Sequence, residues 1–369
     1  MQLFDNKIYI GHGNSSNSEP APNAGPIPIV YYDLDTRKFV KPKVTTYNNA
    51  KQSKKIMKQA ADEEQIDLYK VLNGSIYIPG HDASGENWDF GNFYKLEKDG
   101  WKKYRNIPNA IHVYDMAYYQ GKLFAAISSD GAEVLRSDDG GKSWKSIGYT
   151  SEGARAYTFF TLQNKLYAAG MFYLDNKNTR QTSLLTVNER LEVTSTKVDT
   201  AAWLPGAKTS DPAGYLKMYR PAEWNGKLLY IFGEVDNDHQ TKPQSLVLAS
   251  SIKDTKTVSL PNKNAVPYDI LIRGQTAYVL AAAKLDNGQY MNWVYYSKDG
   301  VRWSENFRFK QDTFARSFEE VKGDFYFGLG GDGDMQCTTK GNSTWCTSSE
   351  PDSATGTILK VEQSAYRKK

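Results

Sequence analysis

Short runs of alternating hydrophobic and polar residues recur along the chain, and each surrounds a tight turn. A turn of the Asn-Gly or Gly-Lys type is followed by an aromatic residue in an apolar run, as in NGSIYIPG and NGKLLYIFG. Alternation on both sides of such a turn is typical of a β-hairpin. The aromatic anchors of these runs are Tyr9, Tyr77, Phe124, Tyr167, Tyr230, Tyr278 and Tyr326.

The spacing of these anchors indicates a repeat architecture. Successive anchors lie 43 to 68 residues apart, and a second hairpin follows in most units, as in NWVYYS and RWSENF around KDGV. Four short strands per unit at this spacing are typical of propeller blades. We therefore predict an all-β fold, a single seven-bladed β-propeller of four-stranded antiparallel blades over residues 1–369. Six blades are the alternative if the short first unit does not count.

Two long intervals between anchors need insertions. The apolar positions within residues 48–65 have helical spacing, so we expect a helical insertion there. A loop rich in Gly, Pro and Ala, from Leu204 to Met218, accounts for the other interval. The first unit lacks most of its first strand. Residues 355–363 either supply this strand or form the third strand of the seventh unit.

Composition excludes several classes of protein. The chain has 25 Tyr, 8 Trp and 40% hydrophobic residues, enough for a large core. A net charge of +4 with interspersed signs gives little attraction to nucleic acid or to anionic membranes. No apolar run is long enough to span a bilayer, and no phosphate-binding glycine loop is present. We expect a monomer without nucleic-acid partners, and a mature or trimmed chain, because the N-terminus lacks a signal-like segment.

The two cysteines, Cys337 and Cys346, are spaced so that a hairpin around residues 337–346 could bring their sulfurs together. A disulfide would place the protein in an oxidising compartment. We therefore expect an extracytoplasmic protein, either periplasmic, on the cell surface or secreted. Two reduced thiols in a cytosolic protein are the alternative.

Two turn motifs point to a known family. SDDGGKSW at Ser137–Trp144 matches the pattern S-x-D-x-G-x-x-W, and SKDGVRW at Ser297–Trp303 is a shorter version. With the blade spacing, this resembles the Asp-box (BNR-repeat) β-propellers, which include the sialidases. The resemblance implies that Asp139 and Asp299 cap turns away from the binding face. The sialidase R-I-P arginine motif is absent, so sialidase chemistry does not follow.

The candidate functional residues occupy equivalent positions of the repeats, which meet on one face of the predicted ring. In a blade, the start of the first strand and the end of the second are adjacent, so these positions meet on one face around the axis. Aligning the units puts a set of basic, aromatic and acidic residues there. The candidate catalytic residues are His81, His112, Tyr114 and Tyr268. The candidate substrate-binding residues are His12, Arg155, Arg220, Arg316, Asp115 and Asp269.

These residue types suit an acidic sugar polymer. Arginine holds a carboxylate or sulfate through its planar fork, and histidine or tyrosine can move a proton. We therefore predict binding of an acidic polysaccharide or oligosaccharide, with cleavage by lyase-type β-elimination as the accompanying reaction. Hydrolysis would instead need a pair of carboxylates, for which the candidates are Asp82, Asp115, Glu223 and Asp269.

Structural roles compete with each of these assignments. Charged residues at the start of inner strands often bond to the neighbouring blade, which would make Arg155, Arg220, Arg316, Asp115 and Asp269 parts of the ring. The whole protein could then be a non-catalytic scaffold for protein or glycan partners. No short-spaced ligand pair supports a metal, and no cofactor is predicted. A structural calcium ion in loops 236–238 and 332–334 remains an alternative, although neither loop has the further acidic residue that calcium-binding loops use.

Aromatic residues offer a second mode of sugar recognition. Trp203 and Tyr215 lie in or beside the long loop, so we predict that they are exposed platforms for a sugar or a protein partner. Trp144, Trp224 and Trp303 fit packing positions between blades.

Overall fold

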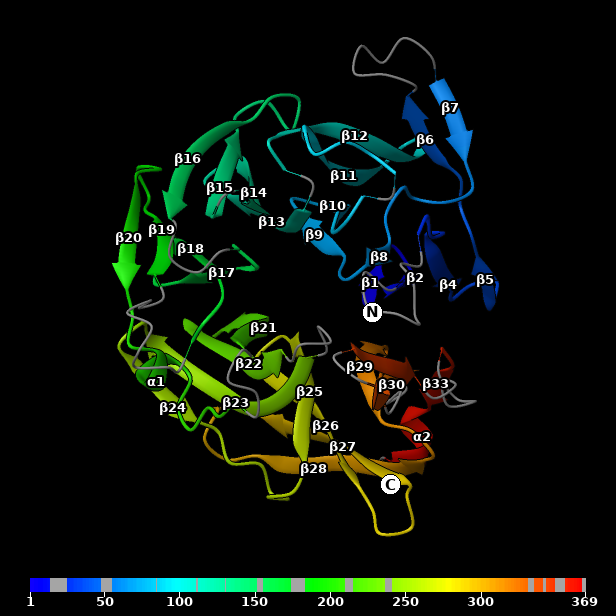
Figure 1. Cartoon of the computed structure of the whole chain (residues 1–369). Helices are drawn as coiled ribbons and strands as arrows, with labels where there is room; N and C mark the ends of the chain where they lie inside the picture. The colour runs from blue at the N-terminus through cyan, green and yellow to red at the C-terminus, as the bar shows by residue number, and fades with distance from the viewer. Residues whose placement is uncertain are drawn as a thin grey trace.

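Seven antiparallel sheets stand in a ring around a common axis in the computed structural model (Figure 1). It describes residues 1–13, 25–47, 55–83, 85–110, 112–129, 131–150, 155–173, 183–209, 215–235, 241–330, 335–340, 343–348 and 356–366. The sheets follow one another along the chain, and in each the first strand lies nearest the axis (Figure 1). The fold is a seven-bladed β-propeller, as the repeat predicted.

The first four blades follow one another along the chain, each with four antiparallel strands. Blade 1 contains β1 (Gln2–Phe4), β2 (Lys7–Ile10), β4 (Val30–Asp33) and β5 (Lys38–Val40). Blade 2 contains β9 (Lys70–Leu72), β10 (Ser75–Pro79), β11 (Phe90–Glu97) and β12 (Gly100–Pro108). Blade 3 contains β13 (His112–Tyr119), β14 (Lys122–Ser128), β15 (Ala132–Ser137) and β16 (Lys145–Thr150). Blade 4 contains β17 (Thr158–Leu162), β18 (Lys165–Ala169), β19 (Ser183–Val187) and β20 (Val193–Lys197).

The last three blades continue the pattern. Blade 5 contains β21 (Tyr215–Trp224), β22 (Lys227–Val235), β23 (Thr241–Ser251) and β24 (Asp254–Thr257). Blade 6 contains β25 (Val266–Arg273), β26 (Thr276–Lys284), β27 (Tyr290–Ser297) and β28 (Ser304–Gln311). The described strands of blade 7 are β29 (Ala315–Val321), β30 (Asp324–Leu329) and β33 (Ile358–Val361). Two four-residue helices, α1 (Thr200–Trp203) and α2 (Gln363–Tyr366), lie between or after blades.

The hairpin phrases fold as predicted, because every aromatic anchor lies on the second strand of its blade. The turn before blade 5's anchor has two residues of positive φ, Asn225 (50°) and Gly226 (73°). Two such residues make the turn type whose twist matches the strands that it joins. Gln163 and Asn164 form the corresponding turn of blade 4, at 51° and 56°.

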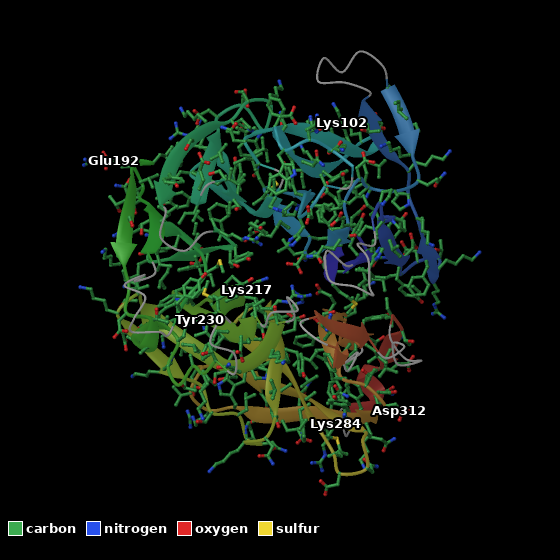
Figure 2. The ribbon with its side chains drawn as sticks, in the orientation of Figure 1. Lys102, Glu192, Lys217, Tyr230, Lys284 and Asp312 are labelled. Carbon is green, nitrogen blue, oxygen red and sulfur yellow. The ribbon has the colours of Figure 1, made fainter. Side chains whose placement is uncertain are left out.

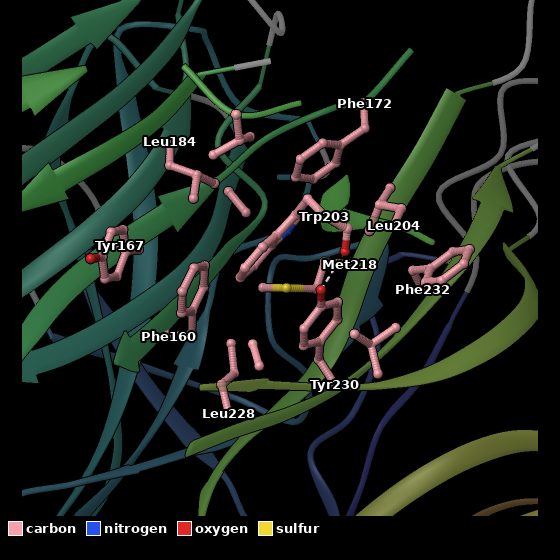
Figure 3. Close-up of a cluster of buried hydrophobic side chains, with 14 of the residues drawn as sticks. Phe160, Tyr167, Phe172, Leu184, Trp203, Leu204, Met218, Leu228, Tyr230 and Phe232 are labelled. Atoms are coloured by element: carbon pink, nitrogen blue, oxygen red, sulfur yellow. Dashed lines mark hydrogen bonds between the residues drawn. The ribbon is translucent and has the colours of Figure 1, made fainter. Parts of the chain in front are cut away.

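The core lies between neighbouring blades. One cluster joins Phe160 and Tyr167 of blade 4 to Tyr230 and Phe232 of blade 5, with Trp203 between them (Figure 3). Trp203 is fully buried, and the Tyr230 hydroxyl donates a hydrogen bond to its carbonyl. The prediction of an exposed Trp203 was therefore wrong, because α1 turns this side chain inward from the loop. Trp224 and Trp303 are buried, as predicted.

The predicted helical insertion is also wrong over residues 55–65; residues 48–54 lie outside the described part of the structure. Within residues 55–65, β7 (Lys55–Lys58) pairs with β6 (Val44–Tyr47), and β6 runs parallel to β12 at the outer edge of blade 2. Further on, β8 (Gln65–Ile66) pairs with β3 (His12–Gly13). Pairing of these segments with existing strands overrides the helical spacing of their apolar residues. The long loop expected up to Met218 also ends early, since β21 begins at Tyr215.

The two ends of the chain contribute strands to different blades. β1 supplies the first strand of blade 1, and β33 pairs with β30 as the third strand of blade 7. Residues 355–363 therefore take the second of the two roles predicted for them. The two blades meet where the Leu3 N–H donates to Glu319 Oε1 at 2.9 Å.

The cysteine hairpin is present as β31 (Met335–Lys340) and β32 (Ser343–Ser348), with Cys337 directly opposite Cys346. The side chains of this hairpin lie outside the described part of the structure, so the disulfide stays a prediction. Among the described residues, no helix has the length and apolar character to cross a membrane.

Candidate functional site at the ring axis

β-bulges position several candidate residues at the same depth. In β13, β25 and β29, the register shifts by one residue, so that one bulge residue stands between two residues that pair with the second strand. These bulge residues are Tyr114, Tyr268 and Arg316, which the repeat alignment had also placed at one position. A bulge of this kind changes the direction of a side chain. β21 also has a bulge, which lies further along the strand and contains Arg220. The φ of Arg220 is +52°, which is uncommon for a residue with a Cβ.

Asp115 and Asp269 join blades. The Asp115 carboxylate accepts hydrogen bonds from the Met116 N–H (2.7 Å) and the Phe159 N–H of the next blade (2.8 Å). Lys70 on the preceding blade pairs with it at 3.0 Å. Both oxygens are therefore engaged in a buried position, which favours the structural alternative over substrate binding.

Asp269 on blade 6 makes the same kinds of contact as Asp115 on blade 3. It accepts hydrogen bonds from the Ile270 N–H (2.9 Å) and from the Phe318 N–H of blade 7 (3.1 Å). Its cationic partner is Arg220, with Nε at 3.4 Å. Arg220, predicted to bind substrate, thus contributes to the inter-blade contact.

His112 begins β13 and is held in one orientation. Its Nδ1 lies 3.1 Å from the His81 carbonyl oxygen and 3.6 Å from Asp82 Oδ1. A carbonyl can only accept, so Nδ1 carries the proton and Nε2 keeps its lone pair. Burial lowers the pKa of His112 and raises that of Asp82 to about 6. At neutral pH the imidazole is therefore an uncharged base.

The Tyr114 ring connects His112 to Arg155. The His112 ring stacks on it with centroids 5.6 Å apart, and the Arg155 guanidinium carbon lies 5.9 Å from its centroid. His81 contacts the same ring edge-on at 5.2 Å. Burial raises the pKa of the Tyr114 hydroxyl, which has no hydrogen-bond partner among the described residues. Four predicted site residues therefore gather here.

Tyrosines and a lysine extend this group across blades 4 and 5. The hydroxyls of Tyr157 and Tyr215 lie 2.9 Å apart with their rings nearly parallel, and Arg155 donates to the Tyr157 hydroxyl at 3.4 Å. Lys217 Nζ lies 4.9 Å from the Tyr157 ring centroid. Figure 2 shows Lys217 toward the middle of the ring, whereas Glu192 lies on its outer edge. No carboxylate in the described ranges lies within salt-bridge distance of Arg155 or Lys217.

Asp67, between β8 and β9, interacts electrostatically with charged side chains on several blades. Although the surrounding protein atoms favour its neutral form, Lys217, Arg220 and Arg316 hold the pKa of this carboxyl below its usual value. Its side chain nevertheless remains exposed to solvent. Burial lowers the pKa of nearby His81 to about 4, against the influence of Asp67, so His81 is neutral at physiological pH. The fixed positive charges outnumber this one carboxylate.

The other predicted residues make a different set of described contacts. Tyr268 stacks on Phe314 with centroids 4.5 Å apart, and the Arg316 guanidinium carbon lies 5.5 Å from the Phe314 centroid. His12 bonds through Nε2 to the Pro28 carbonyl at 2.8 Å. The described contacts therefore divide the candidates into a His112 group on blades 2 to 5, a Phe314 group on blades 6 and 7, and His12 by itself.

Trp88 is a site residue that sequence reasoning missed. It is 71% exposed, in the loop between β10 and β11, and its ring meets His112 edge-on at 5.6 Å. No hydrophobic period marks it, since its neighbours are Asn87 and Asp89. The only sequence signal was its place after the second strand of a blade, on the loop that faces the site.

The turns at Ser137–Trp144 and Ser297–Trp303 are capped by their own aspartates. Asp139 Oδ1 accepts hydrogen bonds from the Lys142 and Ser143 N–H groups at 3.0 Å, and Asp299 Oδ1 does the same for Val301 and Arg302 at 2.8 Å. The Ser143 hydroxyl also donates to Asp139 Oδ2 at 2.6 Å, and this bond together with the N–H bonds holds the pKa of the two carboxyls low. Because successive strands alternate in direction, these turns lie on the face opposite His112.

Among the described residues, no three His, Cys, Asp or Glu side chains are grouped to hold an ion. The predicted calcium loops, 236–238 and 332–334, lie outside the described residues. Of the hydrolytic candidates, Glu223 accepts a hydrogen bond from Thr161 and is exposed on β21.

Comparisons with known proteins bear on the fold alone. No family model and no curated protein matches the chain. A structure of catalytically inactive virginiamycin B lyase from Staphylococcus aureus with quinupristin is 10% identical, with a TM-score of 0.47 over 88% of this chain and 96% of that one. The β-propeller domain of the Trilobed protease from Pyrococcus furiosus is 9% identical, with a TM-score of 0.44 over 81% and 79%.

Proposed function

We propose that this protein binds an acidic polysaccharide or oligosaccharide at the face that carries His112, and cleaves it by β-elimination. One observation supports this most: the Tyr114 ring brings a neutral, oriented imidazole together with Arg155, which has no carboxylate partner in the described ranges. A base beside an available guanidinium suits removal of a proton next to a carboxylate.

The reaction needs no external reactant. The Arg155 guanidinium pairs with the uronate carboxylate, which makes the proton on the adjacent carbon more acidic. His112 Nε2 takes this proton, the electron pair forms a carbon–carbon double bond, and the bond from the β-carbon to the glycosidic oxygen breaks. The Tyr114 ring positions His112 and Arg155, but its hydroxyl is buried from solvent. Solvent therefore supplies the proton to the leaving oxygen and later takes the proton from His112.

We also infer an extracytoplasmic location and a distant relationship to the Asp-box propellers. Opposite residues in an antiparallel pair have Cα atoms about 4.5–5.5 Å apart, within the range that a disulfide bridges, and this supports a bond between Cys337 and Cys346. The two Asp-box turns support the relationship through their hydrogen bonds.

The test is ultraviolet absorbance of unsaturated product during incubation with a panel of uronic-acid polysaccharides. We expect a rise with at least one polymer, and a loss of roughly 10²–10⁴-fold in His112→Ala. Arg155→Gln should also lose activity, whereas Arg302→Gln, on an exposed turn, should not. No product and no calorimetric binding with any polymer would overturn the proposal.

A non-catalytic binding protein is the second candidate. The commitment of Asp115, Asp269 and Arg220 to contacts between blades favours it, since these residues stabilise the ring. Binding of an acidic polymer without product, weakened by Arg155→Gln but not by His112→Ala, would support this alternative.

A further inference from the structure

The loop between β10 and β11 holds an exposed indole beside the candidate base. Trp88 has 71% of its surface exposed, and its ring stands at 83° to His112 with centroids 5.6 Å apart. Leaving so much apolar surface in water is unfavourable. An isolated exposed aromatic residue needs no explanation, but one that touches the proposed base does.

Charged anchors on both sides hold this loop in place. Before Trp88, the Glu86 carboxylate accepts hydrogen bonds from Lys103 Nζ (2.6 Å) and Asn92 Nδ2 (2.7 Å). After it, Asp89 pairs with Arg105, which also donates to the Asn87 carbonyl at 3.0 Å. Lys103 and Arg105 both belong to β12, so the loop is fixed to the sheet below it.

The same anchors reduce the negative charge around Trp88. Glu86 and Asp89 would repel an anionic ligand, but they pair with Lys103 and Arg105. Lys103 also pairs with Asp62, which has Lys58 as a second partner. These ion pairs lessen the repulsion that an acidic polymer meets at the indole, while Asp82 on the same loop stays ionised at neutral pH. A flat ring held in advance also avoids the cost of ordering a side chain on binding.

We propose that Trp88 is a stacking platform for a sugar ring, one unit away from the ring whose proton His112 removes. This inference rests on the proposed function and adds a subsite to it. The C–H face of a sugar packs on the indole face, and the edge contact with His112 sets the distance from platform to base. Short oligosaccharides should reach only His112, whereas longer ones should reach both.

The experiment titrates acidic and neutral oligosaccharides of increasing length into the full chain, with calorimetry and tryptophan emission as readouts. Trp88→Ala should weaken binding of the longer acidic oligosaccharides by 5- to 30-fold and leave the shortest unchanged. Trp88→Phe should keep most of the affinity but lose the ligand-induced change in emission. Tyr149→Ala is the matched control, since Tyr149 is an exposed aromatic residue on the fourth strand of its blade, β16.

The outcomes separate this inference from the proposed function. If acidic oligosaccharides bind and are cleaved but Trp88→Ala binds every length like the wild type, the platform is wrong and the function stands. If only neutral oligosaccharides bind, and Trp88→Ala weakens them, the platform stands and the acidic substrate is wrong. If neither kind binds, both are wrong. An equal loss at every length, with a lower unfolding temperature, would reduce Trp88 to a structural role.

Discussion

The carboxylate of Asp115 on β13 accepts a hydrogen bond from the Phe159 N–H on β17 at 2.8 Å, so one blade holds the inner strand of the next. Asp269 and Phe318 repeat this bond between blades 6 and 7. In both pairs, the other carboxylate oxygen accepts from the next residue in its own strand, and a cation from the preceding blade completes the contact. Each aspartate therefore links three blades.

Asp115→Ala should destabilise the ring. The substitution leaves the Phe159 N–H without its acceptor and Lys70 without its buried partner. We expect a loss of roughly 2–4 kcal/mol in the free energy of unfolding. Urea unfolding followed by circular dichroism measures it. Asp286→Ala, an exposed loop residue, should change stability by less than about 0.5 kcal/mol. Equal stability of the two variants would show that Asp115 does not secure the ring.

Much of the fold follows from local sequence signals. Tyr230 and Tyr278 mark second strands because a two-residue turn and an alternating run specify a hairpin without distant contacts. The segment Lys55–Lys58 was not predictable in this way, because its partner β6 is held by parallel pairing to β12. Tertiary pairing of this kind leaves no mark in the segment itself.

The candidate site was predicted only in part. Repeat alignment places Tyr114 and Arg155 on one face because equivalent positions in a ring share a depth. It could not show that Asp115 points between blades while the adjacent Tyr114 faces His112, since the bulge decides both directions. Trp203 was predicted to be exposed but is buried, and the exposed Trp88 was not predicted at all, because burial depends on α1 and on the β10–β11 loop, neither of which has a periodic pattern.

Glu63 should make stability depend on pH. It is fully buried and accepts hydrogen bonds from Asn92 Nδ2 (2.8 Å), the Tyr94 hydroxyl (3.0 Å) and the Asp82 N–H (3.2 Å). Burial outweighs these donors and raises its pKa from 4.5 to about 8. Between these values the folded chain keeps a proton that the unfolded chain has released. Stability therefore falls as pH rises through this interval, by up to about 1.4 kcal/mol per pH unit.

Glu63→Gln removes the titrating group and should flatten this dependence. Urea unfolding of both proteins at pH 5 and pH 8 gives the comparison, and the wild type should lose more stability between the two than the variant. Glu189→Gln, an exposed substitution, should keep the wild-type slope. Parallel pH profiles for wild type and Glu63→Gln would contradict a raised pKa at Glu63.

Lyase activity should have an acid limb below pH 6.5. Burial lowers the pKa of His112 from 6.5, so its basic form persists into mildly acidic solution. Above this limb His112 stays in its basic form, which leaves a broad plateau of kcat/KM at neutral and alkaline pH. An acid limb above pH 6.5 would count against His112 as the base.

The position of Cys337 opposite Cys346 predicts a disulfide in protein prepared under oxidising conditions. Thiol titration of the denatured chain should find no free thiol before reduction and two afterwards, because the chain has two cysteines. Cys346→Ser should show one thiol without reductant. Closing a short loop stabilises a fold by about 2–3 kcal/mol, so reduction should lower the free energy of unfolding by no more than this. Two thiols in the oxidised, denatured wild type would instead favour the reduced, cytosolic alternative.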